Sequence, residues 1–323
     1  MSTLVLELIT TTAALHRLAP AWAELWHQVP DATPFQHPAW QLPWWSVFGT
    51  EQPIVPCLWE GSQLSGILPL YILERSSERK LLPIGIGLSD FCDALLRPDL
   101  PVNCLHELLH VALDAAGSTC DLTDIPPQAR LRNIHAPSGW REAWRISDPC
   151  PVLEIPREAD CVERVVPARQ RRKLRMNRHR AARCGGWLVH DATGSAEMLE
   201  QLLIQNSCRW GHCDPAVREF LRSAMPNLAR AGLARVTVLS IAGSLAAICL
   251  ALQDQKHRLM FYMSGFEPAV AHVSPGSLLV GAMIDEAISL GRREIHFLRG
   301  GEAYKYAWGA RDHWNAACRL WPA

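Results

Sequence analysis

Residues 261–279 read FYMSGFEPAVAHVSPGSLL, and the architecture of the C-terminal half follows from this stretch. It predicts a strand that ends near Met263, a loop, and an apolar helix that opens at Ser274-Pro-Gly-Ser277. Small residues at the start of a helix leave its first backbone N–H groups uncovered, and the helix dipole favours an anion there. We therefore expect Ser274, Gly276 and Ser277 to bind a phosphate, although plain capping and turn chemistry fits the same residues.

The next predicted strand runs into Phe297-Leu-Arg-Gly-Gly-Glu-Ala-Tyr-Lys-Tyr-Ala-Trp308, where two glycines precede polar and aromatic side chains. Loops that follow strands are where α/β proteins place reactive groups. Arg299 and Lys305 are candidates to meet phosphate, and Tyr304 is a candidate proton donor. The alternative for Tyr304 and its aromatic neighbours is packing against the preceding helix.

Upstream, the same order of elements occurs twice. Each half predicts a helix, three antiparallel strands, a second helix and a strand. The first copy comprises Pro38–Phe48, Ile54–Trp59, Leu64–Leu73, a strand after the turn 74–80, Cys104–Gly117 and Cys120–Ile125. The second comprises Pro215–Gly232, Arg235–Ile241, Leu245–Gln253, Arg258–Met263, Ser277–Gly291 and Glu294–Leu298. The hairpins align at an offset of 181 and the helix-ending glycines, Gly117 and Gly291, at 174. We favour a duplicated α/β unit over coincidence.

Between the two copies lies a strongly basic segment, Arg164–Arg183, which holds nine arginines and lysines. Its few apolar positions predict a mostly solvated helix that ends at Gly185-Gly186. It is either a solvated connector or a basic wall beside a phosphate-bearing ligand or an RNA, and the two interpretations stand level.

Composition excludes several classes of protein. The 323 residues are 49% hydrophobic and 20% charged, which excludes disorder, a collagen-like repeat and a coiled coil. The formal net charge is zero, so any electrostatic attraction for a polyanion is local. The 11 cysteines include no CxxC pair and predict free thiols. We see no secretory leader and no membrane-spanning segment, and expect a cytoplasmic protein.

Other motif-like residues carry little weight. Cys208, His212 and Cys213 cluster without a second ligand pair at zinc spacing, and His106 and His110 lack the glutamate of a zinc-protease motif. We therefore expect no metal. The sequence has neither a Walker loop nor a Gly-x-Ser-x-Gly elbow.

The motifs quoted above, with Pro34-Phe-Gln-His-Pro-Ala-Trp40, Trp44-Trp45 and Gly66-Ile-Leu-Pro-Leu70, resemble a known family. The chain is similar to the CelD-type acetyltransferases of the GNAT superfamily, often described as cellulose-biosynthesis proteins, which are related to the Fem peptidyltransferases. The resemblance spans nearly the whole chain. It implies an α/β (α+β) protein of two tandem GNAT-like domains with mixed, mostly antiparallel sheets.

The resemblance also implies where the donor binds. In a GNAT-like fold the gap between the fourth and fifth strands admits the pantetheine arm of acyl-CoA, and the next helix N-terminus holds the pyrophosphate. Ser274, Gly276 and Ser277 fall at those positions, although the superfamily's usual pair of glycines is reduced to Gly276. The first copy has no glycine at Asp99–Asn103 and is expected to serve the acceptor. The expected domains are residues 1–160 and 187–323, with a basic connector at 161–186.

The resemblance implies an acyltransferase that moves an acyl group, acetyl being the expected one, from acyl-CoA directly to an amine or hydroxyl. The acceptor would be a small molecule, a glycan or a peptide. Asp90, in a polar loop that resembles a family segment facing the cleft, is the candidate base, and a turn-forming aspartate is its alternative. Tyr304 is the candidate acid. Two other functions stay open, a Fem-like transfer from aminoacyl-tRNA and a non-catalytic ligand-binding protein.

Overall fold

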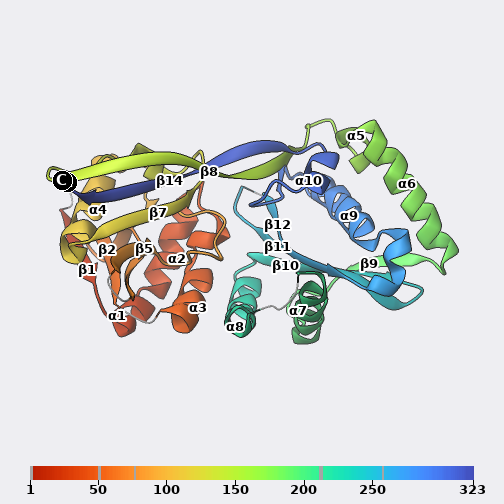
Figure 1. Ribbon diagram of the computed structural model, residues 1–323, viewed down its shortest axis with the longest axis horizontal. Helices are drawn as coiled ribbons and strands as arrows, with labels where there is room; N and C mark the ends of the chain where they lie inside the picture. The colour runs from red at the N-terminus through yellow and green to blue at the C-terminus, as the bar shows by residue number, and fades with distance from the viewer. Residues whose placement is uncertain (1–2, 50–51, 76–77, 211–213, 257) are drawn as a thin grey trace. The chain divides into compact units, whose positions relative to one another are not determined.

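The computed structural model describes residues 3–49, 52–75, 78–210, 214–256 and 258–323. These residues form two compact units, coloured along the chain in Figure 1. Unit 1 comprises Met1–Asp148 together with His313–Ala323, and unit 2 comprises Pro149–Asp312. The C-terminal strand therefore belongs to unit 1. The segment expected as a separate connector, residues 161–186, lies inside unit 2.

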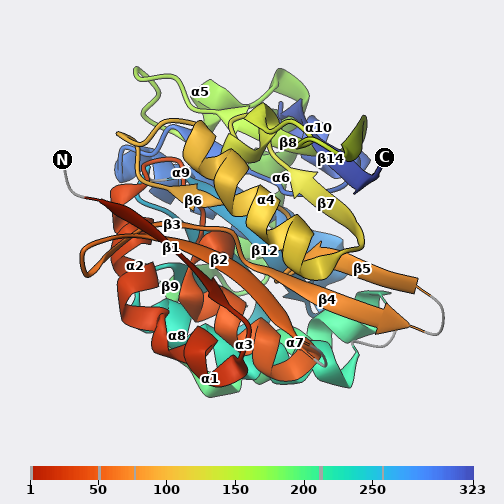
Figure 2. The same ribbon diagram turned by 90° about the vertical axis from the view of Figure 1, so that its left-hand side faces the viewer.

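Unit 1 consists of a mostly antiparallel sheet with helices on both of its faces. Its helices are α1 (Thr12–Arg17), α2 (Ala19–Gln28), η1 (Pro34–Gln36), α3 (Pro38–Phe48), α4 (Asn103–Ala116) and η2 (Arg130–Asn133). Its strands are β1 (Leu4–Ile9), β2 (Pro53–Glu60), β3 (Gln63–Ile67), β4 (Leu70–Arg75), β5 (Glu78–Pro83), β6 (Leu95–Leu96), β7 (Thr119–Ile125) and most of β8 (Trp140–Glu154) and β14 (Arg311–Pro322). Figure 2 shows α4 on one face, with α1 to α3 on the other.

The expected strand Leu64–Leu73 is two strands in the structure. β3 ends at Ile67 and β4 begins at Leu70, and both pair with β2. Pro69 lies between them and has no N–H to donate to a ladder, which is why the strand breaks there. The strand order in unit 1 is β6-β3-β2-β4-β5-β7-β14-β8, with β1 beside β2.

Unit 2 has a similar plan. Its helices are α5 (Val162–Val165), α6 (Ala168–Arg183), α7 (Ala196–Trp210), α8 (Pro215–Arg230), η3 (Pro268–Val273), α9 (Pro275–Ser289) and α10 (Ala303–Ala307). Its own strands are β9 (Trp187–Asp191), β10 (Ala234–Ile241), β11 (Ser244–Gln253), β12 (Leu259–Phe266) and β13 (Glu294–His296), and their order is β13-β12-β11-β10-β9. Figure 1 shows α9 and α6 on one side of this sheet and α7 and α8 on the other.

Backbone conformation supports the duplication residue by residue. Gly61 and Ala242, which are 181 residues apart, both have a left-handed φ, at 61° and 51°. Asp124 and Leu298, which are 174 apart, also share a left-handed φ, at 53° and 59°. Left-handed backbone is costly for residues other than glycine, so its recurrence at Asp124 and Leu298 is not a composition effect.

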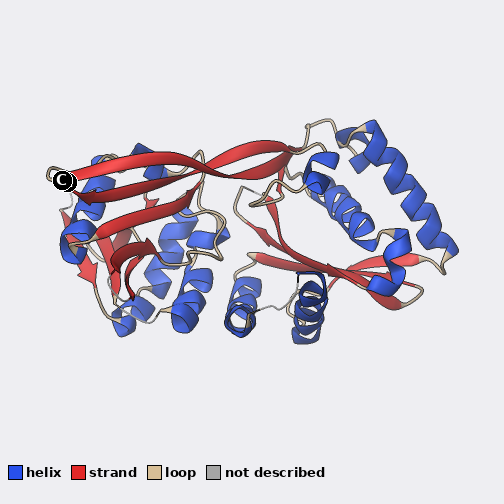
Figure 3. Cartoon of the chain, in the orientation of Figure 1, coloured by secondary structure: helices blue, strands red, loops and turns tan. Residues whose placement is uncertain are grey.

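Each unit contains one short parallel pair of strands. In unit 1, β5 pairs with β7 at two positions, and in unit 2, β12 pairs with β13 at two positions. The strand next to each parallel pair comes from the other half of the sequence. In unit 1, β14 pairs with β7, and in unit 2, β8 pairs with β13. This exchange of strands explains why the units do not end where the repeat ends. β8 and β14 have 15 and 12 residues, and both are drawn as long red strands in Figure 3, which has the orientation of Figure 1.

Each unit has its own apolar core, built on the buried face of α4 in unit 1 and of α9 in unit 2. Nine cysteines in the described ranges are free thiols, and seven of them are buried. Within those ranges, none of the helices combines the length and the apolar character that crossing a membrane requires.

Candidate functional site

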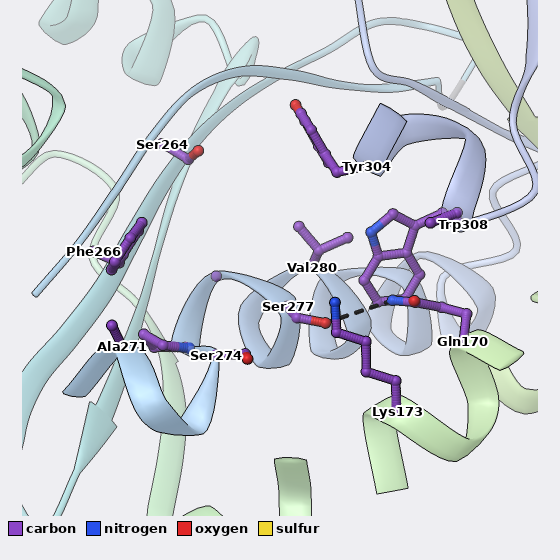
Figure 4. Close-up of a pocket in the computed structure, with 13 residues that line it drawn as sticks. Gln170, Lys173, Ser264, Phe266, Ala271, Ser274, Ser277, Val280, Tyr304 and Trp308 are labelled. Atoms are coloured by element: carbon purple, nitrogen blue, oxygen red, sulfur yellow. Dashed lines mark hydrogen bonds between the residues drawn. The ribbon is translucent and has the colours of Figure 1, made fainter. Parts of the chain in front are cut away.

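A pocket of about 320 Å³ lies in unit 2, between the end of β12, the first turn of α9, α6 and α10 (Figure 4). Its lining is mixed polar and apolar, and holds one charged side chain, Lys173. The lining residues are Gln170, Lys173, Ser264, Phe266, Ala271, Ser274, Pro275, Gly276, Ser277, Val280, Tyr304, Ala307 and Trp308.

The pocket lies where the parallel strands β12 and β13 separate. β12 and β13 pair only at Leu259 with Ile295 and at Met260 with His296. One residue later β12 carries a bulge, since Phe261 and Met263 pair with consecutive residues of β11 and Tyr262 is the extra residue. A bulge bends a strand and redirects its backbone groups. Beyond the bulge, β12 brings Ser264 and Phe266 to the pocket.

The three predicted phosphate ligands lie together at the start of α9. Ser274 has a left-handed φ of 54°, and Pro275 has no N–H. The N–H of Ser277 donates to the carbonyl oxygen of Ser274 at 3.0 Å, so Gly276 offers the N–H that has no acceptor among the described residues. A Cβ at Gly276 would meet no atom within 4 Å. This turn therefore brings one backbone donor and two serine side chains to the pocket.

Helix α6 forms a second wall, which the sequence suggested as a basic wall without identifying its residues. Leu174 packs on Gly281 of α9, where a Cβ would come within 2.8 Å of the Leu174 Cδ1. Next to this contact, Gln170 Nε2 lies 3.5 Å from Ser277 Oγ. On the other side, Arg178 binds Asp285 at 2.7 Å and Glu163 at 2.5 Å. The helix is thus fixed against α9 and is not a loose connector.

Tyr304 and Trp308 reach the pocket from α10. The Tyr304 ring packs edge-on against Phe297 at 6.2 Å between centroids, and the residue is 46% exposed. Trp308 is buried and also belongs to the core. The predicted packing of these aromatics therefore occurs, and Tyr304 also lines the pocket. Its role as a proton donor stays a prediction. Tyr306 is engaged elsewhere, because its hydroxyl donates to Asp312 at 2.7 Å, which raises its pKa.

Lys305, expected to meet phosphate, does not line the pocket. Its ammonium is buried and donates to the carbonyl oxygens of Leu298, Arg299 and Gly300 at 2.7–3.0 Å. It also lies 2.9 Å from a carboxylate oxygen of Glu302. An ammonium has three hydrogens, so none is left for a donor phosphate. Arg299 lies in the same loop and does not line the pocket.

Asp90 lies in unit 1, in the loop between β5 and β6. It is half-buried, and its carbonyl oxygen accepts a hydrogen bond from Asn315 Nδ2 at 2.9 Å. Its role as a base stays a prediction. Asp93 in the same loop accepts backbone N–H bonds from Ala94, Arg130 and Leu131, and burial raises its pKa to about 7.

No group of three or more potential metal ligands occurs in the described part of the chain. His212 and Cys213 lie outside the described residues, so the structure adds nothing on that cluster. His106 contacts the carbonyl oxygen of Asn133 at 3.1 Å, and His110 lies 3.2 Å from Asp114.

Residues 168–306 match a family described as an acetyltransferase (GNAT) domain. No curated protein matches the chain in sequence. Among solved structures, FemX is similar, with a TM-score of 0.66 and 11% identity over 92% of this chain and 95% of FemX. So is the C-terminal domain of a putative lysylphosphatidylglycerol synthetase from Agrobacterium fabrum, with a TM-score of 0.60 and 12% identity over 96% and 92% of the two chains. A conserved protein of unknown function from Bacteroides thetaiotaomicron has a TM-score of 0.57 and 12% identity over 99% and 100%.

At these identities the likeness to solved structures concerns the fold, and the expected fold class is confirmed. The narrower CelD-type assignment stays a prediction. The lining residues from Gln170 to Tyr304 lie within the matched segment, and Ala307 and Trp308 follow its end. Residues 168–306 are thus similar to a GNAT domain, and the chain as a whole shares its fold with FemX.

Proposed function

We propose that unit 2 is an acyltransferase domain that moves an acyl group, acetyl being the simplest, from acyl-CoA directly to an amine or hydroxyl acceptor. The pocket between β12, α6 and the start of α9 carries this proposal. It is narrow, partly apolar, and bordered at one end by the Gly276 N–H and two serine hydroxyls. Such a site suits a thin apolar arm that ends in a phosphate.

Direct transfer needs three groups. As the acceptor attacks the thioester carbonyl, a carbon–nitrogen or carbon–oxygen bond forms and the carbon–sulfur bond breaks. A base takes the acceptor proton, N–H donors stabilise the oxyanion, and an acid protonates the leaving thiolate. Tyr304, whose exposed ring borders the pocket, is the proposed acid, and Asp90 is the proposed base. The acceptor is a small molecule, glycan or peptide, and the cytoplasm is the proposed compartment.

A second candidate is transfer from aminoacyl-tRNA, as the resemblance to Fem proteins implies. Two observations favour it, the likeness of the fold to FemX and the exposed cations of α6. Arg172, Arg175 and Arg183 are exposed and have no ion pair among the described residues. Binding that neutralises RNA phosphates would weaken steeply as salt rises.

Calorimetric titration with acetyl-CoA and with free CoA tests the first proposal. We expect micromolar binding that is lost in Gly276→Trp, because open space at the Cβ lets the indole enter the pocket rather than the core. Gly276→Ala is the matched control, and should keep both the fold and the affinity.

Three outcomes separate the candidate functions. Binding that disappears in Gly276→Trp, without a change in the circular dichroism spectrum, supports the acyl-CoA proposal. No binding of either ligand to the wild type would overturn it, and charged tRNA would be titrated next. A protein that binds neither donor would leave the non-catalytic ligand-binding function.

A further inference from the structure

Among the described residues that line the pocket, Lys173 is the one with a charged side chain, and none carries a carboxylate. It is exposed and has no ion pair among the described residues. The other cation expected here, Lys305, has all its hydrogens directed at carbonyl oxygens of its own loop. The described lining of the pocket therefore has one positive charge, on Lys173, and no negative charge to pair with it.

The contacts on either side of Lys173 fix where it stands. Gln170, one turn earlier, is 5% exposed and reaches Ser277, and Leu174, the next residue, is buried on Gly281. Figure 4 shows the side chains of Gln170 and Lys173 extending from α6 towards the first turn of α9. The ammonium thus belongs to the same end of the pocket as the Gly276 N–H, although it comes from a helix outside the repeated unit.

The size of the pocket indicates which part of a donor meets this charge. A volume of about 320 Å³ is at the lower end of the roughly 300–1,000 Å³ of ligand pockets, so it holds one arm of a large molecule. The phosphates of acyl-CoA must then lie at the mouth. Arg169 and Arg180, at i−4 and i+7 from Lys173, are exposed on the same side of α6 and extend the positive charge outwards.

We infer that Lys173 of α6 binds the diphosphate of the acyl-CoA donor, opposite the start of α9. The inference rests on the proposed function. The diphosphate is the group joined directly to the pantetheine arm, so it reaches the mouth first. The ammonium supplies a point charge, and the Gly276 N–H and the two serine hydroxyls supply directional donors.

The test is the affinity of Lys173→Gln for three probes, namely CoA, 3′-dephospho-CoA and pantetheine, which lacks phosphate. Loss of a charge-assisted contact should weaken CoA and 3′-dephospho-CoA about tenfold to a hundredfold, and leave pantetheine unchanged. Lys173→Arg should keep most of the affinity. Arg175→Gln is the matched control, because Arg175 is an exposed cation of the same helix that does not line the pocket.

Unchanged CoA affinity in Lys173→Gln would overturn the inference while leaving the proposed function intact. An equal loss in Arg175→Gln would mean a diffuse field rather than a contact, and equal weakening of pantetheine would mean a structural effect; either result overturns it. A loss confined to CoA would assign the contact to the 3′-phosphate, against the diphosphate. If CoA does not bind the wild type at all, the proposed function itself fails.

Discussion

The two units differ in what lies between their parallel strands, which are β5 and β7 in unit 1 and β12 and β13 in unit 2. In unit 2 the space between β12 and β13 is a pocket. In unit 1 the loop after β5 enters the corresponding space, and the N–H of Cys92 donates to the carbonyl oxygen of Asp124 on β7 at 2.8 Å. The segment between strand and helix is residues 84–102 in unit 1 and 267–274 in unit 2. The longer loop of unit 1 thus lies where unit 2 has its pocket.

Side chains from three directions hold the unit 1 loop closed. Gln36 donates to the carbonyl oxygen of Phe91 at 2.6 Å, Trp40 donates to the Ser89 hydroxyl at 2.9 Å, and Asn315 holds Asp90. The strand pairing beside the gap also differs between the units. The register between β4 and β5 is regular, whereas the register between β11 and β12 is interrupted by a bulge. This comparison supports a single donor site, in unit 2.

In both units a cationic side chain donates to carbonyl oxygens at the end of a strand or in the loop after it. The strand is β7 in unit 1 and β13 in unit 2. Arg132 donates to the carbonyl oxygens of Ile125 and Pro126 at 2.9 and 3.2 Å. Lys305 donates to those of Leu298, Arg299 and Gly300, and Ile125 and Arg299 are 174 residues apart. Because the arrangement recurs in the unit whose gap is closed, we assign Lys305 to holding the loop.

Removing these cations should have the largest effect. Lys305→Met leaves three carbonyl oxygens without their donor, and should lower the free energy of unfolding of unit 2 by about 3 kcal/mol. Arg132→Met should cost about 1–2 kcal/mol, since Arg132 is only half-buried. Urea unfolding followed by near-UV circular dichroism measures both. A folded Lys305→Met protein of wild-type stability that no longer binds CoA would instead make Lys305 a donor ligand.

Tyr304→Phe tests whether the pocket of unit 2 is a catalytic site. Once an acceptor is known, turnover should fall about a hundredfold with donor affinity unchanged, because the acid for the leaving thiolate is removed. Tyr306→Phe serves as its control, since that hydroxyl binds Asp312. Wild-type turnover in Tyr304→Phe would exclude this tyrosine as the acid.

The closed loop of unit 1 should make its stability depend on pH. Burial raises the folded-state pKa of Asp93 to about 7 from an ordinary value of 3.8, so between these pH values the folded state binds more protons than the unfolded state. The contribution of Asp93 to stability should be fully present below about pH 4 and lost as pH rises through about 7. Asp93→Asn should flatten this profile in thermal unfolding, and an unchanged slope would assign the pH dependence to other groups.

The smallest effect should come from exchanging the matched turn residues. Gly61→Ala places a side chain in left-handed backbone and should lower stability by about 1 kcal/mol, with no steric contact within 4 Å to confuse the result. Ala242→Gly relieves the same strain, and should raise stability by less than about 1 kcal/mol because glycine has more entropy when unfolded. Changes of the same sign in both variants would break the equivalence of the two turns.

Local patterns in the sequence predicted much of this molecule. Helix α3 has the predicted bounds, and Gly117 and Gly291 follow the ends of α4 and α9 with left-handed φ, as helix-ending glycines do. The start of α9 at Ser274–Ser277 was predictable because small residues before an apolar run are a local signal. The role of Lys305 was not, since a buried cation and an exposed one look alike in sequence.

By itself, the sequence determined the repeat, the element types and the residues at the start of α9, because periodicity, turns and caps act over a few residues. Only the tertiary structure decided which strands the units exchange, that α6 forms a wall of the pocket, and that the loop of unit 1 closes its gap. These features depend on contacts such as Leu174 with Gly281 and Cys92 with Asp124. Such partners are far apart in the chain, and their pairing is set by packing and hydrogen-bond satisfaction, which no local pattern encodes.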